Sequence, residues 1–423
     1  MHWRVPLAWG LLLLLTWGAI ESACLGALWA FRLRGHHAPL EARFTLGDDT
    51  RRRIPRIVQG REQYYPHDAL LGWTAKPGGS TRLYHANAQG MRADREYAPF
   101  PPAGVVRIAA FGDSFVQGNE VANPDAWPAV LEGLRPGLEV LNFGVGAYGV
   151  DQSLLRYLRD GSRFRPHVVV IGFMTENIHR HVNRFRPFYS PRPYSPWAKP
   201  RFALQGEGLV LVPNPLPRRR DYRSLLRDEE ATLARLGSGD YYWERIWRPV
   251  RLGFLPSARL ASFLAASWSD TRTLIGGRYN PRSEAFEVTA RLLEAFSDAV
   301  LEAGALPFIA IFPQRSDLEA VWDGKPRPDQ PLLDRLAARG LVHLDLSDCF
   351  ERTPGPVSFM PSDHYAPTTN QRVARCLLVA LEGAGALDAA GTLAGLRSRR
   401  AARGPFAGSV PLALGEAGTS TKP

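Results

Sequence analysis

Cysteine is scarce in this chain, with three residues among 423, and no two of them have the Cys-x-x-Cys spacing. A structural zinc site is therefore not expected. Cys24 lies within an N-terminal apolar segment, which leaves Cys349 and Cys376 as a pair that could form one disulfide in an oxidising compartment. The sequence also has no internal repeat, which argues against a repeat architecture.

Acidic residues are in deficit, with 41 Asp and Glu against 52 Lys and Arg and a formal net charge of +11. Much of the excess lies in clusters at residues 51–53, 218–220 and 397–403. Such clusters could contact nucleic acid, anionic lipid or an acidic polymer. No nucleic-acid-binding signature accompanies them, so we expect a solvated basic surface and no nucleic-acid partner.

Residues 5–31 form one long apolar run that can span a hydrocarbon core of about 30 Å. Glu21 interrupts the run and is costly there unless it is paired or close to an interface. A cleaved signal peptide, an uncleaved anchor and a lipoprotein signal at Cys24 are the three interpretations. Residues 1–34 contain no clean cleavage site, and Glu21 stands where a lipoprotein signal has an aliphatic residue, so we expect an uncleaved anchor.

Positive charges do not decide on which side of a membrane the rest of the chain lies. Arg4 precedes the apolar run, and Arg32, Arg34 and Arg43 follow it. The positive-inside rule therefore does not favour an outward-facing domain.

Short apolar runs alternate with amphipathic stretches from residue 105 to about residue 385, after an irregular approach segment at residues 35–104. The run at 167–173 is apolar throughout, as in a strand covered on both faces. Strands are expected at residues 105–111, 138–143, 167–173, 307–312 and 342–346, and helices at 151–159, 283–303 and 369–381. This order predicts an α/β fold in three layers, with a parallel, flavodoxin-like sheet of about five strands flanked by helices.

Residues 178–282 break the alternation and form an inserted region rich in Pro, Arg and aromatic residues. A hairpin is expected at 202–212, with Gly206 and Gly208 at its turn. A substrate-facing lid and a surface elaboration without ligand contact are both compatible with this composition. Residues 386–423 are rich in Ala, Gly and Arg and are expected to be a disordered tail.

Gly112-Asp113-Ser114-Phe115 follows the first predicted strand, at the edge of the sheet where ligands bind in such folds. Three further motifs follow in order, and they are Asn142-Phe143-Gly144-Val145-Gly146-Ala147-Tyr148-Gly149, Thr175-Glu176-Asn177 and His364-Tyr365-Ala366-Pro367. Together they resemble the conserved blocks of the SGNH (GDSL-type) esterases and acyltransferases over about residues 85–382. Residues 87–92 are similar to the approach segment of the membrane-anchored members of that family.

The resemblance implies a role for each motif. Ser114 would attack an acyl carbon, and His364 would accept its proton and pass it to the leaving alcohol. The backbone amides of Ser114 and Ala147 and the side-chain amide of Asn177 would form the oxyanion hole.

Two positions depart from the family pattern. Ala147 stands where the family has its oxyanion glycine, and a glycine-only backbone conformation would be strained there. The family's aspartate two or three residues before the histidine is absent, and Asp363 is the adjacent acidic residue. Neighbours on an extended segment point to opposite sides, so a backbone carbonyl could orient the imidazole in place of Asp363.

Two other motifs admit different chemistry. Gly144-x-Gly146-x-x-Gly149 also matches a dinucleotide fingerprint, with Glu176 as the ribose ligand, but a Rossmann unit normally opens its domain. His179 and His181 suggest metal binding, yet no further ligand stands at the required spacing, so we expect a solvated loop there. The elbow pattern Gly-x-Ser-x-Gly is absent around Ser114, which disfavours an ordinary α/β-hydrolase.

The sequence therefore predicts a membrane-anchored serine esterase that acts on O-acyl esters of a small molecule, glycan or lipid. An O-acyltransferase of an extracytoplasmic polysaccharide and a catalytically silent binding module are the alternatives. No metal and no organic cofactor are expected. The resemblance places the domain outside the cytoplasm, in the periplasm or the extracellular space.

Overall fold

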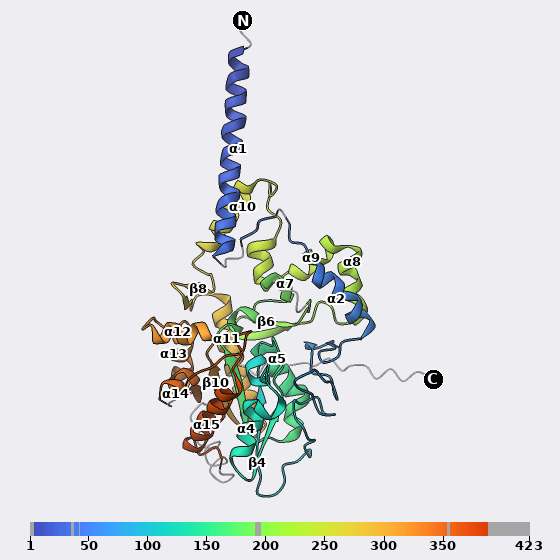
Figure 1. The fold of residues 1–423 in the computed structure, drawn as a ribbon, viewed down its shortest axis with the longest axis vertical. Coiled ribbons are helices and arrows are strands. Elements are labelled where there is room, and N and C mark those ends of the chain that lie inside the picture. The colour runs from blue at the N-terminus through green and yellow to red at the C-terminus, as the bar shows by residue number, and fades with distance from the viewer. Residues whose placement is uncertain (1–3, 35–37, 42, 191–195, 353–355, 388–423) are drawn as a thin grey trace, which may run out of the picture.

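The structure is a computed structural model that describes residues 4–34, 38–41, 43–190, 196–352 and 356–387 (Figure 1). The predicted tail lies outside these residues from position 388 onward. At the centre is a parallel sheet of five strands in the order β11-β10-β5-β3-β4. Its strands are β3 (Val106–Phe111), β4 (Leu138–Asn142), β5 (Val168–Met174), β10 (Leu306–Phe312) and β11 (His343–Asp345). The predicted α/β fold and all five predicted strands are confirmed.

Helices cover both faces of this sheet, because alternate strand residues point to opposite sides. Ala109 and Phe111 belong to a buried cluster with α5 and α11, whereas Ile108 and Ala110 belong to a second cluster with α4 and α15. The four helices are α4 (Trp127–Leu134), α5 (Val150–Arg156), α11 (Glu284–Glu302) and α15 (Pro367–Gly383). A further three, α12 (Arg315–Trp322), α13 (Gln330–Ala338) and α14 (Leu346–Arg352), pack near β10 and β11.

Strand β3 is the first strand of the sheet along the chain, and its two neighbours, β4 and β5, lie on opposite sides of it. The chain therefore reverses its direction of winding at β3. Ligands of open α/β sheets bind at the carboxyl ends of the strands beside such a reversal. The sheet thus places the loops after β3, β4 and β5 where a site is expected.

The approach segment is packed against the core. It contains α2 (Asp48–Gln59) and the short strands β1 (His67–Asp68) and β2 (Gly72–Trp73). Trp73 is buried, and its indole N–H donates a hydrogen bond to the Gly146 carbonyl at 3.0 Å. Tyr148 donates in return to the Trp73 carbonyl. The segment thereby fixes the glycine-rich turn that follows β4.

The inserted region lies over the carboxyl edge of the sheet and contains the predicted hairpin. The antiparallel pair β6 (Arg201–Gln205) and β7 (Gly208–Val212) confirms that prediction. Its other elements are α6 (Asn177–Arg180), α7 (Arg186–Tyr189), α8 (Ser224–Arg227), α9 (Glu229–Gly237), α10 (Pro256–Ser267), β8 (Leu274–Ile275) and β9 (Arg278–Tyr279). A cavity of about 530 Å³ separates the insertion from the ends of β5 and β10.

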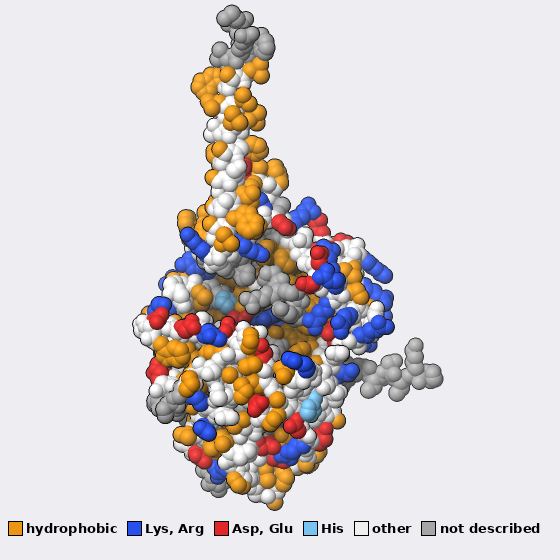
Figure 2. Space-filling model, in the orientation of Figure 1, with side chains coloured by type: hydrophobic (Ala, Val, Ile, Leu, Met, Phe, Trp, Pro, Cys, Tyr) orange, Lys and Arg blue, Asp and Glu red, His pale blue; other side chains and the backbone are white. Residues whose placement is uncertain are grey.

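Helix α1 (Arg4–Leu33) projects from the body and is long and apolar enough to cross a membrane (Figures 1 and 2). Its last third packs against α10 through Leu28, Phe31 and Phe263. The Glu21 carboxylate accepts hydrogen bonds from the Ser257 amide at 2.9 Å and the Ser257 hydroxyl at 2.6 Å. Pairing with α10 therefore satisfies the one acidic group of the apolar run.

Candidate active site

Ser114 begins the short helix α3 (Ser114–Gln117), directly after β3, and its side chain is mostly buried. Asp113, and not Ser114, caps this helix, because the Asp113 carboxylate accepts a hydrogen bond from the Phe115 amide at 2.9 Å. Gly112 is required before it, since a Cβ at this position would lie 2.4 Å from the Val116 side chain. The Ser114 hydroxyl is thus not used as a helix cap.

The second oxygen of the Asp113 carboxylate anchors the loop that follows β5. It accepts hydrogen bonds from the Asn177 side-chain amide at 2.9 Å and from the Arg180 guanidinium at 3.1 Å. All three side chains are buried. Asn177, predicted as an oxyanion donor, is therefore held by Asp113, the residue before Ser114, and one of its two amide hydrogens is committed to that carboxylate.

His364 is oriented by Glu120, a residue outside the motifs that predict the site. The His364 Nδ1 lies 2.9 Å from a Glu120 carboxylate oxygen. A carboxylate accepts, so Nδ1 carries the proton and Nε2 is left as the basic nitrogen. This is the tautomer that a general base for a serine hydroxyl needs.

Asp363, the acid expected from the sequence, does not contact the imidazole. Its side chain is largely exposed and forms an ion pair with the Arg315 guanidinium at 2.7 Å. Asp363 has φ of 63°, so the segment is not extended at this residue, and its carboxylate is bonded to Arg315 in place of the imidazole. The structure thus corrects the expected partner of His364 to Glu120.

Arg92, from the approach segment, fixes the loop that carries Glu120. The buried Arg92 guanidinium donates hydrogen bonds to the carbonyls of Gln117 at 2.7 Å, Gly118 and Val121 at 2.6 Å. Glu120 itself has φ of 67°, a left-handed conformation that is unfavourable for a residue with a side chain. Several bonds from one arginine thereby stabilise the strained loop in the conformation that faces His364.

The glycine-rich turn after β4 places Ala147 in a left-handed conformation, with φ of 67°. This is the conformation that glycine adopts without strain, as expected from the family pattern. The Gly146 amide donates to the Tyr65 hydroxyl at 3.2 Å. Among the described residues, neither the Ser114 nor the Ala147 amide has a hydrogen-bond acceptor. Strain of this kind is concentrated at functional sites, and Glu120, Ala147 and Asp363 are three of the five non-glycine residues described with positive φ.

The loops of Ser114 and His364 pack against each other through Phe115. The Phe115 ring lies 5.5 Å from the His364 ring and 4.8 Å from the Tyr365 ring, measured between centroids. The amides of Gly118 and Asn119 both donate to the Ser114 carbonyl. These bonds close a tight turn that ends directly before Glu120. No hydrogen bond joins the Ser114 hydroxyl to the imidazole in this structure. Such bonds are often long in enzymes without substrate.

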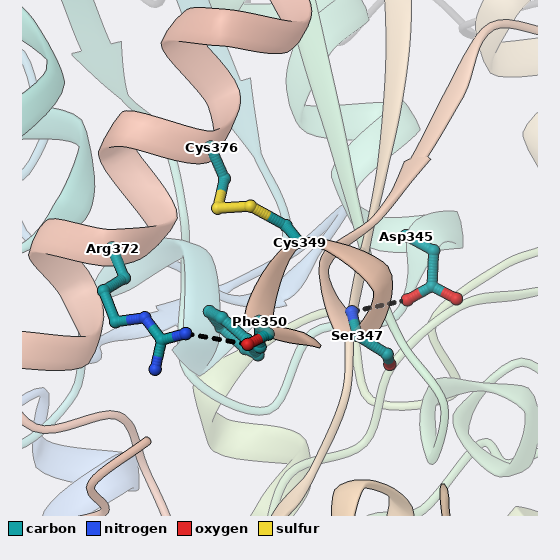
Figure 3. The surroundings of a disulfide bond; sticks show 6 residues. All are labelled: Asp345, Ser347, Cys349, Phe350, Arg372 and Cys376. Carbon is teal, nitrogen blue, oxygen red and sulfur yellow. Dashed lines mark hydrogen bonds between the residues drawn. A yellow bond between two sulfur atoms is a disulfide. The ribbon is translucent and has the colours of Figure 1, made fainter. Parts of the chain in front are cut away.

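A disulfide between Cys349 and Cys376 joins α14 to α15, with a Cα–Cα distance of 6.2 Å (Figure 3). The predicted pairing is confirmed. Arg372 donates a hydrogen bond to the Phe350 carbonyl at 2.9 Å beside it. The closed segment carries His364, and cross-linking a loop with a sequence separation of 27 stabilises the fold by about 3.5 kcal/mol in the chain-entropy estimate.

The glycines of the dinucleotide-like motif are explained by contacts within the chain. A Cβ on Gly144 would lie 2.4 Å from the Gln117 amide nitrogen, and one on Gly149 would lie 2.5 Å from the Asp151 carboxylate. Glu176, the ribose ligand of that alternative, forms an ion pair with Arg180. The three residues thus serve packing around α3 and α5.

His181 belongs to the core, so the expectation of a solvated loop is wrong for it. Its ring is fully buried, and Nε2 accepts a hydrogen bond from the Val150 amide at 2.9 Å. The Nδ1 donates to Thr289, whose own hydroxyl donates to the Ala285 carbonyl. His179 bonds to the Tyr242 hydroxyl at 2.7 Å. Within the described ranges, no group of three or more potential ligands could hold a metal ion.

Acidification from pH 7.5 to pH 5 is expected to lower the free energy of unfolding by about 2 kcal/mol through His181. Burial lowers the pKa of His181 from 6.5 to about 3. Between these values the unfolded chain binds the proton and the native state does not, so stability falls as the pH falls. Denaturant unfolding at several pH values measures this slope. A His181→Gln variant, which does not titrate, should show a flatter profile, and identical profiles would contradict the assignment.

The cavity of about 530 Å³ lies one strand away from Ser114, at the ends of β5 and β10. The core contributes Thr175, Gln314 and Asp317, and the insertion contributes mainly aromatic and apolar side chains, among them Tyr242 and Phe263. A concave, largely apolar site with a few polar groups is typical of small-molecule binding. Neither Ser114 nor His364 lines it.

No protein-family model matches the chain, and no curated protein matches its sequence. Among solved structures, it is similar to one described as a lipolytic protein of the G-D-S-L family from Desulfitobacterium hafniense DCB-2. That alignment has 12% identity, covers 64% of this chain and 99% of that chain, and has a TM-score of 0.32. A second solved structure is similar at 13% identity, over 66% of this chain and 97% of its own, with a TM-score of 0.33. We therefore base the function on the residues of the site.

Proposed function

We propose that the protein is a membrane-anchored serine hydrolase that cleaves O-acyl esters. The observation that carries the proposal is the Glu120–His364 contact, together with the contact between the His364 ring and Phe115, the residue after Ser114. This contact supports an imidazole with its proton on Nδ1, and the serine that follows β3 is not used as a helix cap. Sequence motifs after β3, β4 and β5 and near the C-terminus meet at this edge of the sheet.

The reaction follows from these groups. The Ser114 Oγ attacks the acyl carbon while His364 Nε2 takes the hydroxyl proton. The oxyanion of the tetrahedral intermediate accepts hydrogen bonds from the Ser114 and Ala147 amides and from the Asn177 side chain. When this intermediate collapses, the proton passes to the leaving alcohol, and the acyl group remains on Ser114. Water then releases the carboxylic acid by the same steps.

An O-acyltransferase uses the same residues, and the acyl-enzyme is then resolved by an acceptor hydroxyl instead of water. A small acyl group on a glycan or lipid is the proposed substrate class. Acetate release measured with and without an added glycan acceptor separates the two reactions. Transfer lowers free acetate in proportion to the acylated glycan formed.

Helix α1 is proposed as an uncleaved membrane anchor, with the catalytic domain outside the cytoplasm. The helix has the length and apolarity to span a bilayer. The disulfide between Cys349 and Cys376 supports an oxidising compartment, because cytosolic thiols are kept reduced.

Covalent labelling with a fluorophosphonate probe tests the proposal. The full-length protein in detergent should gain one phosphonyl group on the tryptic peptide that contains Ser114. Ser114→Ala should abolish labelling, whereas Ser162→Ala, a partly buried serine outside the site, should label like the wild type. A wild-type protein that stays unlabelled, or a Ser114→Ala variant that labels normally, would favour the silent binding module.

A further inference from the structure

The turn that precedes α10 presents apolar side chains to solvent. Phe254 is 70% exposed and Leu252 is 55% exposed. The turn is tightly hydrogen-bonded, from the Gly253 amide to the Val250 carbonyl at 2.9 Å and from the Leu255 amide to the Leu252 carbonyl at 2.8 Å. We call residues 250–255 the apolar turn. Its two side chains are held outward by a defined backbone.

The contacts between α1 and α10 fix the position of this turn along α1. Ser257, in the first turn of α10, bonds to Glu21. Six residues later, Phe263 packs against Phe31 at 5.2 Å between ring centroids. The two helices therefore run side by side in the same direction. The apolar turn lies at the end of α10 that is nearer to residues 4–20 of α1, which we call the free part of this helix.

The free part of α1 is slightly too short to cross a bilayer alone. Residues 4–20 of this helix extend about 25 Å at 1.5 Å per residue. A hydrocarbon core is about 30 Å thick. A bilayer around residues 4–20 therefore also has to cover the next turn of α1, which contains Glu21. Ser257 donates two hydrogen bonds to the Glu21 carboxylate, which lowers the free-energy cost of placing this group in the bilayer.

We infer that the apolar turn enters the interface of the same phospholipid bilayer that α1 spans. This inference rests on the proposed membrane anchor. Phe254 and Leu252 lie at acyl-chain depth, and the exposed Arg248 and Arg251 lie at headgroup level. Helix α10 also lines the cavity through Phe263, so the bilayer contact holds the cavity and the adjacent sheet edge close to the membrane surface.

Quenching of a fluorescent label by spin-labelled lipids tests this placement. The full-length protein carries Cys24→Ser, so the remaining cysteines are those of the disulfide. An NBD group is then attached to one of three introduced cysteines, Leu13→Cys in α1, Phe254→Cys in the apolar turn or Val379→Cys in α15. The native side chains at these positions are 68%, 70% and 69% exposed, so exposure to solvent is matched. Each protein is reconstituted into phosphatidylcholine–phosphatidylglycerol vesicles with doxyl-labelled acyl chains.

Strong quenching is expected at positions 13 and 254, with quenching at 254 at least about fivefold above that at 379. Strong quenching at 13 with equal, weak quenching at 254 and 379 would overturn the inference and leave the anchor intact. Weak quenching at 13 would overturn the anchor and, with it, the inference. Labelling of Ser114 by the fluorophosphonate probe is measured separately in each variant, so both quenching outcomes are independent of the proposed hydrolase activity.

Discussion

Glu120→Gln is expected to lower kcat for ester hydrolysis by about 10³- to 10⁴-fold, with KM little changed. The Glu120 carboxylate accepts the Nδ1 proton of His364 at 2.9 Å and, in the proposed reaction, stabilises the imidazolium formed when Ser114 attacks. The glutamine amide can donate to Nδ1 instead, which favours the tautomer with the proton on Nε2. Loss of a positioning carboxylate in this way costs about 10⁴ in a serine protease triad.

Asp363→Asn is the matched control, because both variants exchange one carboxylate for an amide in a residue with positive φ. Asp363 contacts Arg315 at the surface, so its variant should retain kcat within about twofold. Steady-state kinetics on a chromogenic acetyl ester measures both variants. Partial recovery of kcat in Glu120→Asp would separate positioning from a purely structural role. The opposite pattern, with Asp363→Asn inactive and Glu120→Gln active, would return the role to Asp363.

The sheet could be predicted from the sequence because its signal is local. The runs at residues 108–111 and 168–173 are apolar throughout, as in a strand covered on both faces. Ser114 could be placed at a strand end, because its motif follows the first predicted strand, whereas His364 was identified from the resemblance of its motif. The carboxyl ends of parallel strands share one edge of the sheet, so the loops that follow the predicted strands could be placed on that edge from the sequence.

The partner of His364 could not be predicted because it is 244 residues away along the chain. The sequence offers Asp363 as the acid adjacent to His364. Asp363 has a left-handed backbone conformation and pairs with Arg315, and no sequence pattern predicts such a conformation for a residue other than glycine. One signal was present, since Gly118 ends α3 after four residues and keeps Glu120 on the same edge as Ser114.

Composition was least informative about the contacts of the insertion. Proline, arginine and aromatic residues suggested an irregular surface, yet several of its charged side chains are buried in contact with the core. Lys199 is fully covered, and its ammonium contacts the buried carboxylate of Asp151 in the first turn of α5. A buried charge must be paired, and the pair here joins the insertion to the helix that follows the glycine-rich turn. Only the tertiary structure shows that the partners meet.

Lys199→Met is expected to lower the free energy of unfolding by about 3–5 kcal/mol, because it leaves the Asp151 carboxylate buried without its partner. Methionine keeps the length of the apolar stem, so packing changes little. Lys325→Met is the matched control, since Lys325 forms an exposed ion pair with Asp323 at 2.9 Å. Exposed pairs contribute at most about 1 kcal/mol, so this variant should unfold almost like the wild type.

Denaturant unfolding followed by tryptophan fluorescence measures both variants, and a double replacement identifies the cause. If the cost of Lys199→Met is the unpaired carboxylate, then adding Asp151→Leu should recover most of the lost stability, because an apolar pair replaces a buried ion pair at little cost. A double variant less stable than Lys199→Met would mean that the two side chains stabilise the fold through separate contacts. Equal stability losses in Lys199→Met and Lys325→Met would mean that the insertion is not held to α5 by a buried charge. The first outcome is expected, because Asp151 has no exposed surface and its other oxygen accepts a hydrogen bond from the Gln152 amide at 2.9 Å.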